Sequence, residues 1–205
     1  MFENIEWLFF DIGSTLVDEH LAYEHTFRDI AGLTNLDYAF IYDEALEYYR
    51  KNKKGDIELG LKYNIPKRNW YIEDEILYED VPDCLKILSK KYRIGIIANQ
   101  SLGTKIRLDK WGIMKYIDLV IASAEEGVSK PNPKIFEIAL QRAKCKANKA
   151  IMIGDRIDND IVPAKKMGMR TIWVKQGLGS YWQITGDDEK PDYIVKSIIE
   201  LCNFL

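Results

Sequence analysis

The chain has 205 residues, of which 47% are hydrophobic and 30% charged, and its formal net charge is -3. This length suffices for one core or for a core with a smaller insertion, and the composition is that of an ordinary soluble globular protein. The charge balance gives no electrostatic reason to expect a nucleic acid as partner. No apolar run approaches the ~20 residues that span a bilayer, so we expect no membrane insertion.

The three cysteines, Cys84, Cys145 and Cys202, are scattered along the chain and show no C-x-x-C spacing. This pattern is typical of reduced thiols inside a cell rather than of a disulfide framework or a zinc site. The N-terminus shows no secretion signal. We therefore expect a cytoplasmic protein.

The first predicted element is a buried strand over the apolar residues from Ile5 to Phe10. It changes abruptly into Asp11, Gly13 and Ser14, which are typical of a loop. Ligands bind beyond the carboxyl ends of the strands in open parallel α/β sheets. Asp11 is therefore a candidate active-site residue.

Residues 18–78 differ in character, being rich in Tyr, Glu, Leu and Lys. Apolar residues at helical spacing predict one helix around Leu21, His25, Phe27 and Ile30, and another around Ile41, Ala45, Leu46 and Tyr49. Further short helices are predicted near 56–63 and 67–77, and no strand signal interrupts the segment. We expect this helical insertion to form a separate lid over the site.

From Val81 onward, strand and helix patterns alternate. Strands are expected at 94–98, 118–122, 150–154, 170–174 and 193–195, and helices at 82–91, 103–110, 134–143, 157–167 and the C-terminus. Such alternation predicts an α/β fold, a Rossmann-like parallel sheet with helices on both faces. We expect a core domain of residues 1–16 and 80–205 and an all-helical cap of residues 17–79.

Carboxylates follow two of the predicted strands. Asp11 follows the first, and the group Asp155, Asp158 and Asp160 follows the strand at 150–154. Converging carboxylate oxygens suit Mg²⁺, and Lys130, in a loop at the same edge, would add a fixed positive charge. A carboxylate nucleophile, a divalent cation and a lysine together indicate phosphoryl transfer.

With these motifs the chain resembles the haloacid dehalogenase-like (HAD) hydrolases, in the helical-cap branch that includes phosphoglycolate phosphatase-like proteins. The resemblance is carried by FFDIGSTL at 9–16, IIANQ at 96–100, SKPNP at 129–133 and IGDRIDNDI at 153–161. These motifs occur in the family's order and cover the chain from end to end. The resemblance implies a Mg²⁺-dependent hydrolase of a small phosphorylated metabolite.

The resemblance also implies roles for single residues. Asp11 would be the nucleophile that becomes phosphorylated, and Lys130 would neutralise Asp11 and the phosphoryl oxygens. The metal ligands would be Asp11, the backbone carbonyl of Gly13, and Asp155. Asp160 would support the metal shell or hold Lys130.

Phosphate binding would fall to Ser14, Thr15, Asn99 and Lys130, with Asn99 also orienting its own loop. The implied partner is a small-molecule phosphate ester, bound by a monomer or a homodimer. Aromatic residues at Trp173, Tyr181 and Trp182 could form an interface, although packing is the commoner use of such residues.

Two positions depart from the family pattern. Gly13 stands where phosphatases of the family carry a second Asp, which protonates the leaving group and then activates water. General acid–base help of this kind is worth about 10²–10⁴ in rate. Ala98 stands where the family has a Thr or Ser that donates to the phosphate, and losing one such donor costs about 10²–10³.

Other side chains could substitute for these losses: Asp18 and Glu19 at the start of the cap, Ser14, Ser101, and the cap tyrosines Tyr23, Tyr48 and Tyr49. Each of these residues could instead be an ordinary surface or packing residue. Asp158 is interpreted as a helix cap that lies near the metal. The histidines, His20 and His25, have no partner at ligand spacing and are interpreted as surface or half-buried.

Gly13 also bears on other branches of the family. Dehalogenases carry a bulky aromatic at this position and need no metal, so the intact acidic fourth motif argues against them. Phosphonate-cleaving members carry a small residue and use a cap lysine to form a Schiff base. The cap has such lysines in Lys51, Lys53, Lys54 and Lys62, of which the first three resemble a solvated helix end.

Two hypotheses follow for the function. The first is a phosphatase that works through an aspartyl-phosphate on Asp11, favoured by the intact Asp11, Lys130, Asp155 and Asp160. The second is a family member that binds metal and phosphate ligands without efficient turnover, favoured by Gly13 and the alanine of the second motif.

Overall fold

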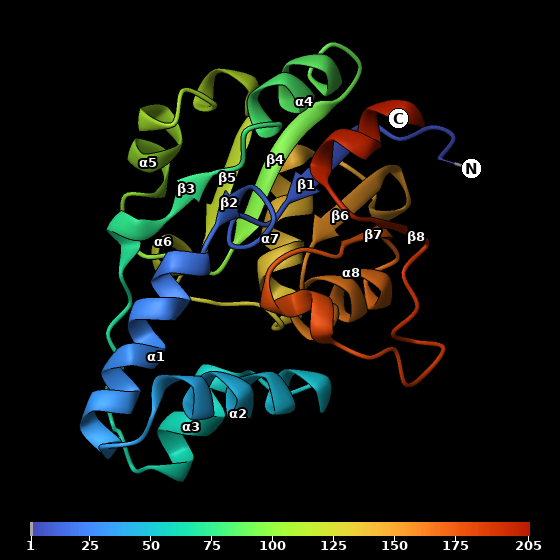
Figure 1. Cartoon of the computed structure of the whole chain (residues 1–205). Helices are drawn as coiled ribbons and strands as arrows, with labels where there is room; N and C mark the ends of the chain where they lie inside the picture. Colours follow the sequence, from blue (N-terminus) through green and yellow to red (C-terminus); the bar gives the residue numbers. More distant parts are fainter. Residues whose placement is uncertain (1) are drawn as a thin grey trace.

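The computed structural model describes residues 2–205 and confirms the predicted α/β architecture (Figure 1). Six parallel strands form one sheet in the order β5-β4-β1-β6-β7-β8. The strands are β1 Trp7–Phe10, β4 Arg93–Ala98, β5 Leu119–Ala122, β6 Ala150–Gly154, β7 Arg170–Val174 and β8 Tyr193–Val195. The strand order reverses at β1, which pairs with β4 on one side and β6 on the other. The crevice beyond these three carboxyl ends is where such sheets bind ligands.

Helices cover both faces of this sheet. The α-helices of the core are α4 Val81–Leu88, α5 Thr104–Lys110, α6 Ser123–Glu126, α7 Pro133–Ala143 and α8 Val162–Lys166. Short 3-10 helices lie at Met114–Tyr116, Ala147–Lys149, Leu178–Tyr181 and Ile198–Asn203, and a π-helical turn at Ile157–Ile161. No helix within residues 2–205 is both long and apolar enough to cross a membrane.

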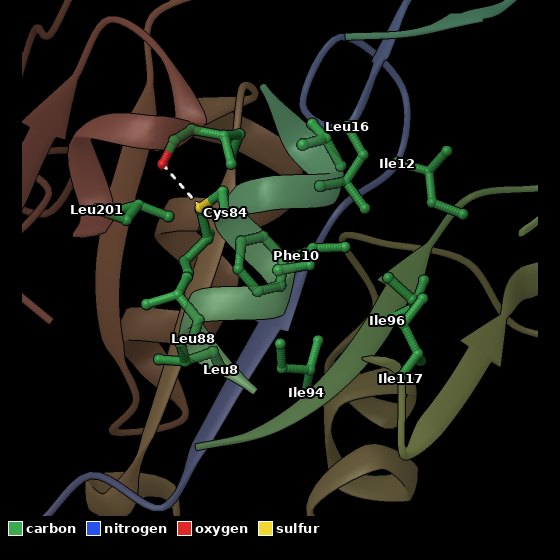
Figure 2. Close-up of a cluster of buried hydrophobic side chains, with 14 of the residues drawn as sticks. Leu8, Phe10, Ile12, Leu16, Cys84, Leu88, Ile94, Ile96, Ile117 and Leu201 are labelled. Carbon is green, nitrogen blue, oxygen red and sulfur yellow. Dashed lines mark hydrogen bonds between the residues drawn. The ribbon is translucent and has the colours of Figure 1, made fainter. Parts of the chain in front are cut away.

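The side chains of β1 alternate between two hydrophobic cores, because successive residues of a strand point to opposite faces. Leu8 and Phe10 pack with Cys84 and Leu88 of α4 and with Leu201 near the C-terminus (Figure 2). On this face the Cys84 thiol donates to the carbonyl oxygen of Ile198, 3.2 Å away.

Trp7 and Phe9 point to the opposite face, where they pack against Phe136 and Ala139 of α7. Gly95 of the neighbouring strand makes room for this arrangement, since a Cβ there would lie 2.5 Å from two carbons of the Phe9 ring. Both faces of β1 are therefore buried, and this holds the end of the strand, and Asp11 with it, in a fixed position.

The insertion contains three α-helices, α1 His20–Thr34, α2 Tyr38–Arg50 and α3 Gly55–Lys62. They share a separate hydrophobic cluster that includes Phe27, Ile41 and Leu59. In Figure 1, α1 runs away from the core, and α2 and α3 lie at its far end, away from the sheet. Two short strands join the insertion to the core, β2 Val17–Asp18 and β3 Ile76–Leu77, which pair antiparallel. The prediction that no strand occurs in this segment is wrong, because two-residue strands are too short to show alternation.

The predicted helix over 67–77 is also wrong. This segment holds a 3-10 helix at Ile72–Asp74 and then β3. Residues before it are held to α1 by side-chain bonds: the Thr26 hydroxyl donates to the Asn69 carbonyl oxygen at 3.0 Å, and the Tyr71 hydroxyl donates to Asp29 at 2.6 Å. Tertiary contacts have therefore replaced helical hydrogen bonds here.

Smaller differences concern element ends and surfaces. The helix predicted at 157–167 begins with the π-helical turn before α8, and the C-terminal helix is of the 3-10 type. Leu21, predicted on the buried face of its helix, is 40% exposed, while Trp173 and Trp182 are buried. The two tryptophans therefore serve packing rather than an exposed interface.

Candidate active site

A cavity of about 260 Å³ lies at the carboxyl ends of β1, β4 and β6, between the sheet and the inserted helices. Its core side includes Asp11, Gly13, Asn99, Gln100, Ser101, Lys130, Asp155, Arg156 and Asn159. Its other side comes from the insertion, with Glu19, Tyr23, Lys54, Trp70, Ile72 and Glu75. The predicted crevice and the predicted lid thus enclose one site.

Lys130 forms the charged centre of this site. Its side chain is 1% exposed, and its ammonium lies 2.8 Å from Asp11 Oδ1 and 2.5 Å from Asp160 Oδ1. The second oxygen of Asp160 accepts from the backbone N–H of Arg156 at 3.0 Å. Each oxygen of Asp160 thus has a partner, one in Lys130 and one in the backbone of its own loop, which agrees with one of the two roles expected for it.

The backbone of the loops supports this arrangement. Gly154 lets Asp160 approach the end of β6, since a Cβ there would lie 2.7 Å from the Asp160 Cβ. Gly179 likewise lets its backbone approach Asp155, since a Cβ added at Gly179 would lie 2.6 Å from Asp155 Oδ2. The backbone carbonyl of Asp155 also accepts from the Trp173 indole at 2.7 Å. The backbone of Asp155 is thus fixed by Trp173, while its side chain lines the cavity.

The three carboxylates of the cluster carry more negative charge than the single ammonium of Lys130 can balance. Oxygens of Asp11, Asp155 and Asp160 lie within 4.8 Å of one another, a grouping able to hold a metal ion. Burial, together with the charges of Asp11 and Asp160, raises the pKa of Asp155 well above its usual range. Burial opposes the charge of Lys130, but the two carboxylates beside it outweigh burial and raise its pKa. One lysine against three carboxylates is a donor set that fits a hard divalent cation.

Asn99 orients the loop that carries Lys130. Its side-chain amide donates to the Lys130 carbonyl oxygen at 2.9 Å, and its own oxygen accepts from the Lys130 backbone N–H at 2.7 Å. α7 begins directly after this loop, with Pro133 in its first turn and the Asn132 side chain capping the N–H of Lys134. Asn99 lies in the cavity lining, and two of its side-chain hydrogen bonds go to the loop.

Ser14 and Thr15, predicted to bind phosphate, are not among the residues that line this cavity. Ser14 is buried and left-handed at φ 51, and its hydroxyl donates to Glu19 Oε2 at 2.8 Å. The Thr15 hydroxyl is buried and has no hydrogen-bond partner among residues 2–205. The predicted role of both side chains in phosphate binding finds no support in this geometry.

Glu19 is brought back to Gly13 by a tight loop. The backbone N–H groups of Leu16 and Val17 both donate to the Ile12 carbonyl oxygen, at 2.8 and 3.0 Å. A Cβ at Gly13 would lie 2.8 Å from Glu19 Cδ and 2.9 Å from Oε2, and closer still to Oε1. Desolvation raises the pKa of the Glu19 carboxyl to about 8, against the opposing effect of the Ser14 hydrogen bond.

The other side chains that could replace the groups missing at Gly13 and Ala98 fall into two sets, inside and outside the cavity lining. Ser101 and Tyr23 line the cavity, whereas Tyr48 and Tyr49 do not. Asp18 does not line it either, and its Oδ1 accepts from the backbone N–H of His20 at the start of α1. Of the five, Asp18 is thus identified as a residue that stabilises the start of a helix.

Two predictions about single residues need correction. Asp158 does not cap a helix but accepts from Arg156 Nε at 2.9 Å, which holds that guanidinium at the cavity wall. Lys54 is not part of a solvated helix end: it precedes α3 and lines the cavity, with Nζ 4.0 Å from Asp56 Oδ1. His25 is exposed, as expected, and Nδ1 lies 2.6 Å from Asp74 Oδ2.

No sequence pattern predicts that Trp70 and Glu75 belong to the site. The Trp70 indole donates to Glu75 Oε1 at 2.9 Å, and Glu75 Oε2 is buried without a hydrogen-bond partner in the described part of the chain. Burial raises the pKa of this carboxyl above its usual range. Both residues belong to the segment that was predicted as a helix, and only its path along α1 brings them to the cavity.

Comparison with known proteins agrees with the motifs and the fold. Residues 127–201 match the family model described as HAD-hydrolase-like. The chain is 34% identical over 203 residues to a glyceraldehyde 3-phosphate phosphatase of Pyrococcus abyssi, covering 84% of this chain and 82% of that protein. It is 32% identical to the same-named protein of Pyrococcus furiosus, with coverage of 98% and 93%.

Solved structures share the fold. A HAD phosphatase from Thermococcus onnurineus superposes with a TM-score of 0.65 at 21% identity, covering 97% of each chain. The HAD-hydrolase YfnB of Bacillus subtilis, in a form bound to magnesium, gives a TM-score of 0.70 at 20% identity and 98% coverage of each chain. At these identities the superpositions establish the architecture alone.

Proposed function

Since the chain belongs to the HAD-like hydrolases, we propose that it is a Mg²⁺-dependent phosphatase that hydrolyses a small phosphate ester through an aspartyl-phosphate on Asp11. The observation that carries the proposal is the contact of Asp11 with a buried lysine at the end of β1, 2.8 Å between Oδ1 and Nζ. Relatives at 32–34% identity are phosphatases by name, and this supports the reaction class.

The chain's own residues divide the work as follows. Asp11 attacks the phosphorus with one carboxylate oxygen, and Lys130 offsets the negative charge on that carboxylate and on the phosphoryl oxygens. Asp160 and Asn99 hold the lysine in place through its ammonium and its backbone. Positioning and charge neutralisation supply most of the catalysis in phosphoryl transfer.

Mg²⁺ would be held by Asp11, Asp155 and the backbone carbonyl of Gly13. When bound, it would neutralise charge on the phosphoryl group and relieve the repulsion among the carboxylates. The grouped oxygens and the raised pKa of Asp155 support this assignment, because a buried anionic cluster gains most from a cation. Asp160 then acts indirectly, through Lys130.

Residues 17–79 would form the cap domain, joined to the core domain of 1–16 and 80–205 through the β2–β3 pair. The separate hydrophobic cluster of the three inserted helices supports this division. Closure of the cap would exclude water and select the substrate. A cavity of about 260 Å³ suits a small phosphorylated metabolite rather than a macromolecule.

The test is release of phosphate by the purified protein from p-nitrophenyl phosphate and from a panel of sugar phosphates that includes glyceraldehyde 3-phosphate. Release with Mg²⁺, loss of release with EDTA, and no activity in Asp11→Asn are expected. Asp83→Asn, a change to an exposed carboxylate on α4, serves as the matched control and should keep full activity. Equal activity of Asp11→Asn and Asp83→Asn would refute the mechanism.

Two alternatives give other outcomes. A protein that binds metal and phosphate without turnover would show Mg²⁺-dependent phosphate binding by calorimetry and no release from any ester. Cleavage of a phosphonate is favoured by one observation, the position of Lys54 in the cavity lining. In that case borohydride would trap a carbonyl-bearing phosphonate covalently on Lys54, and Lys54→Met would abolish the adduct.

A further inference from the structure

The loss of the second carboxylate at position 13 leaves a gap in the chemistry of the proposed reaction. An ordinary phosphate ester needs a proton on its leaving oxygen, and the phosphorylated Asp11 needs a water from which a proton is removed. Among the residues described, the cavity is lined by the carboxylates of Asp11, Glu19, Glu75 and Asp155, and by no histidine. Asp11 and Asp155 already have roles, so Glu19 and Glu75 remain.

Geometry separates these two. A Cβ built on Gly13 points into the carboxyl group of Glu19, within 2.9 Å of Cδ and of both oxygens. The first side-chain atom of an aspartate at position 13 would therefore occupy the place where the Glu19 carboxylate now lies. The three atoms nearest this Cβ all belong to Glu19 and none to Glu75, one oxygen of which is bonded to the Trp70 indole.

The Glu19 carboxylate is also held in this place. Its Oε2 accepts from the Ser14 hydroxyl at 2.8 Å, while Oε1 is the atom nearest the missing Cβ. The backbone of Gly177 packs closely against Ser14, since a Cβ added at Gly177 would lie 2.7 Å from the Ser14 hydroxyl oxygen. The loop from Ile12 to Val17 closes on its own backbone hydrogen bonds, which fixes the start of the cap beside Gly13.

We propose that Glu19, supplied by the first residues of the cap, is the general acid and base of this site and takes the place of the carboxylate absent at Gly13. The inference rests on the proposed phosphatase activity.

The proton inventory of the two steps is balanced. As the Asp11 oxygen bonds to phosphorus, the bond from phosphorus to the ester oxygen breaks, and that oxygen takes the proton of Glu19 and leaves as an alcohol. Water then attacks the phosphorus and gives one proton to the Glu19 carboxylate. The bond to Asp11 breaks, inorganic phosphate leaves, and both side chains return to their first states.

The decisive variant is Glu19→Gln, assayed with p-nitrophenyl phosphate because p-nitrophenolate leaves without a proton. A burst of one p-nitrophenolate per protein is expected, followed by steady-state release slower by roughly 10²–10⁴. Intact-mass spectrometry should find the variant carrying one phosphoryl group, which a merely structural change would not produce. Asp18→Asn is the matched control: it changes the adjacent carboxylate, which lies outside the cavity lining, and should keep the wild-type rate and no adduct.

A second variant moves the carboxylate back. Glu19→Ala vacates the space, and adding Gly13→Asp should raise turnover at least tenfold over Glu19→Ala alone; circular dichroism confirms folding of each variant. Steady-state rates of Glu19→Gln equal to wild type, or no gain from Gly13→Asp in the Glu19→Ala protein, would overturn the assignment. If wild type itself forms no phosphoprotein and releases no phosphate, the proposed function fails first, and the role of Glu19 falls with it.

Discussion

Replacing Lys130 with Met tests whether the charged cluster is balanced by this one ammonium. Lys130 is almost completely buried, and it contacts Asp11 and Asp160 at 2.8 and 2.5 Å. Methionine keeps most of the volume of the side chain and removes the charge. The side chain of Asp160, which is 0% exposed, then keeps the backbone N–H of Arg156 as its one partner among the described residues.

The expected cost follows from these distances. At an effective dielectric constant of 20, each ion-pair contact of this length is worth about 6 kcal/mol of Coulomb attraction, much of which offsets the desolvation of the lysine. Leaving a buried partner unpaired costs about 3–5 kcal/mol. We therefore expect Lys130→Met to lower the free energy of unfolding by about 3–5 kcal/mol at pH 8.

Proton uptake should reduce this loss at lower pH. Without the ammonium, burial raises the pKa of the unpaired carboxyl in the folded state above its unfolded value, so protonation favours the folded protein. The stability gained from the bound proton is present at low pH and disappears as pH rises through the folded pKa. The loss caused by Lys130→Met should thus shrink by up to about 1.4 kcal/mol per pH unit on going from pH 8 to pH 5.

Urea denaturation of wild type and variant in EDTA at several pH values measures this effect. Adding Asp160→Asn to Lys130→Met removes the unpaired charge and should recover about half of the loss. Lys134→Met is the control, because Lys134 is exposed and its ion pair with Glu137 is worth about 1 kcal/mol or less. A loss for Lys130→Met no greater than that for Lys134→Met would refute the reasoning.

Three further predictions concern single positions. Folding raises the pKa of Glu19 to about 8, so the free energy of unfolding should fall as pH rises from about 5 to about 8. Urea denaturation at each pH measures this slope, and Glu19→Gln should flatten it. Gly154→Ala would place a Cβ 2.7 Å from the Cβ of Asp160 and should cost about 1–3 kcal/mol in urea denaturation, whereas Gly32→Ala, with open space around it, should not destabilise. Cys84 is buried and burial raises its pKa, so iodoacetamide should label it in urea but not in the native protein, as read by peptide mass spectrometry.

The charge cluster links stability and chemistry in this site. Asp11, Asp155 and Asp160 lie close together in a buried position, which is unfavourable in the absence of a cation. The protein stabilises them with one lysine and with backbone contacts, so negative charge remains on the cluster for the proposed Mg²⁺ to balance. In the proposed phosphatase, the same arrangement that limits stability would make the site reactive.

Much of the fold could be predicted from the sequence because it depends on local patterns. Apolar runs such as Trp7–Phe10 and Ala150–Gly154 predict buried strands, and alternating strands and helices leave few ways to form a sheet. Once the strands are parallel, Asp11 and Asp155 must lie at the same edge. The order of the four motifs then identifies the family.

Tertiary structure alone decided the features that local patterns do not encode. The segment that carries Trp70 and Glu75 follows α1 because the side chains of Asn69 and Tyr71 donate to Asp29 of that helix, which overrides any helical tendency of its own. Lys54 and Glu19 face the cavity because of the way the insertion folds over the sheet. Glu19 could be named from the sequence only as one of several candidates, since nothing in its spacing from Gly13 shows that a tight loop returns it there. The sequence by itself determined where the strands end and which carboxylate begins the site. Contacts between distant residues determined which side chains complete it, because such contacts depend on packing rather than on periodicity.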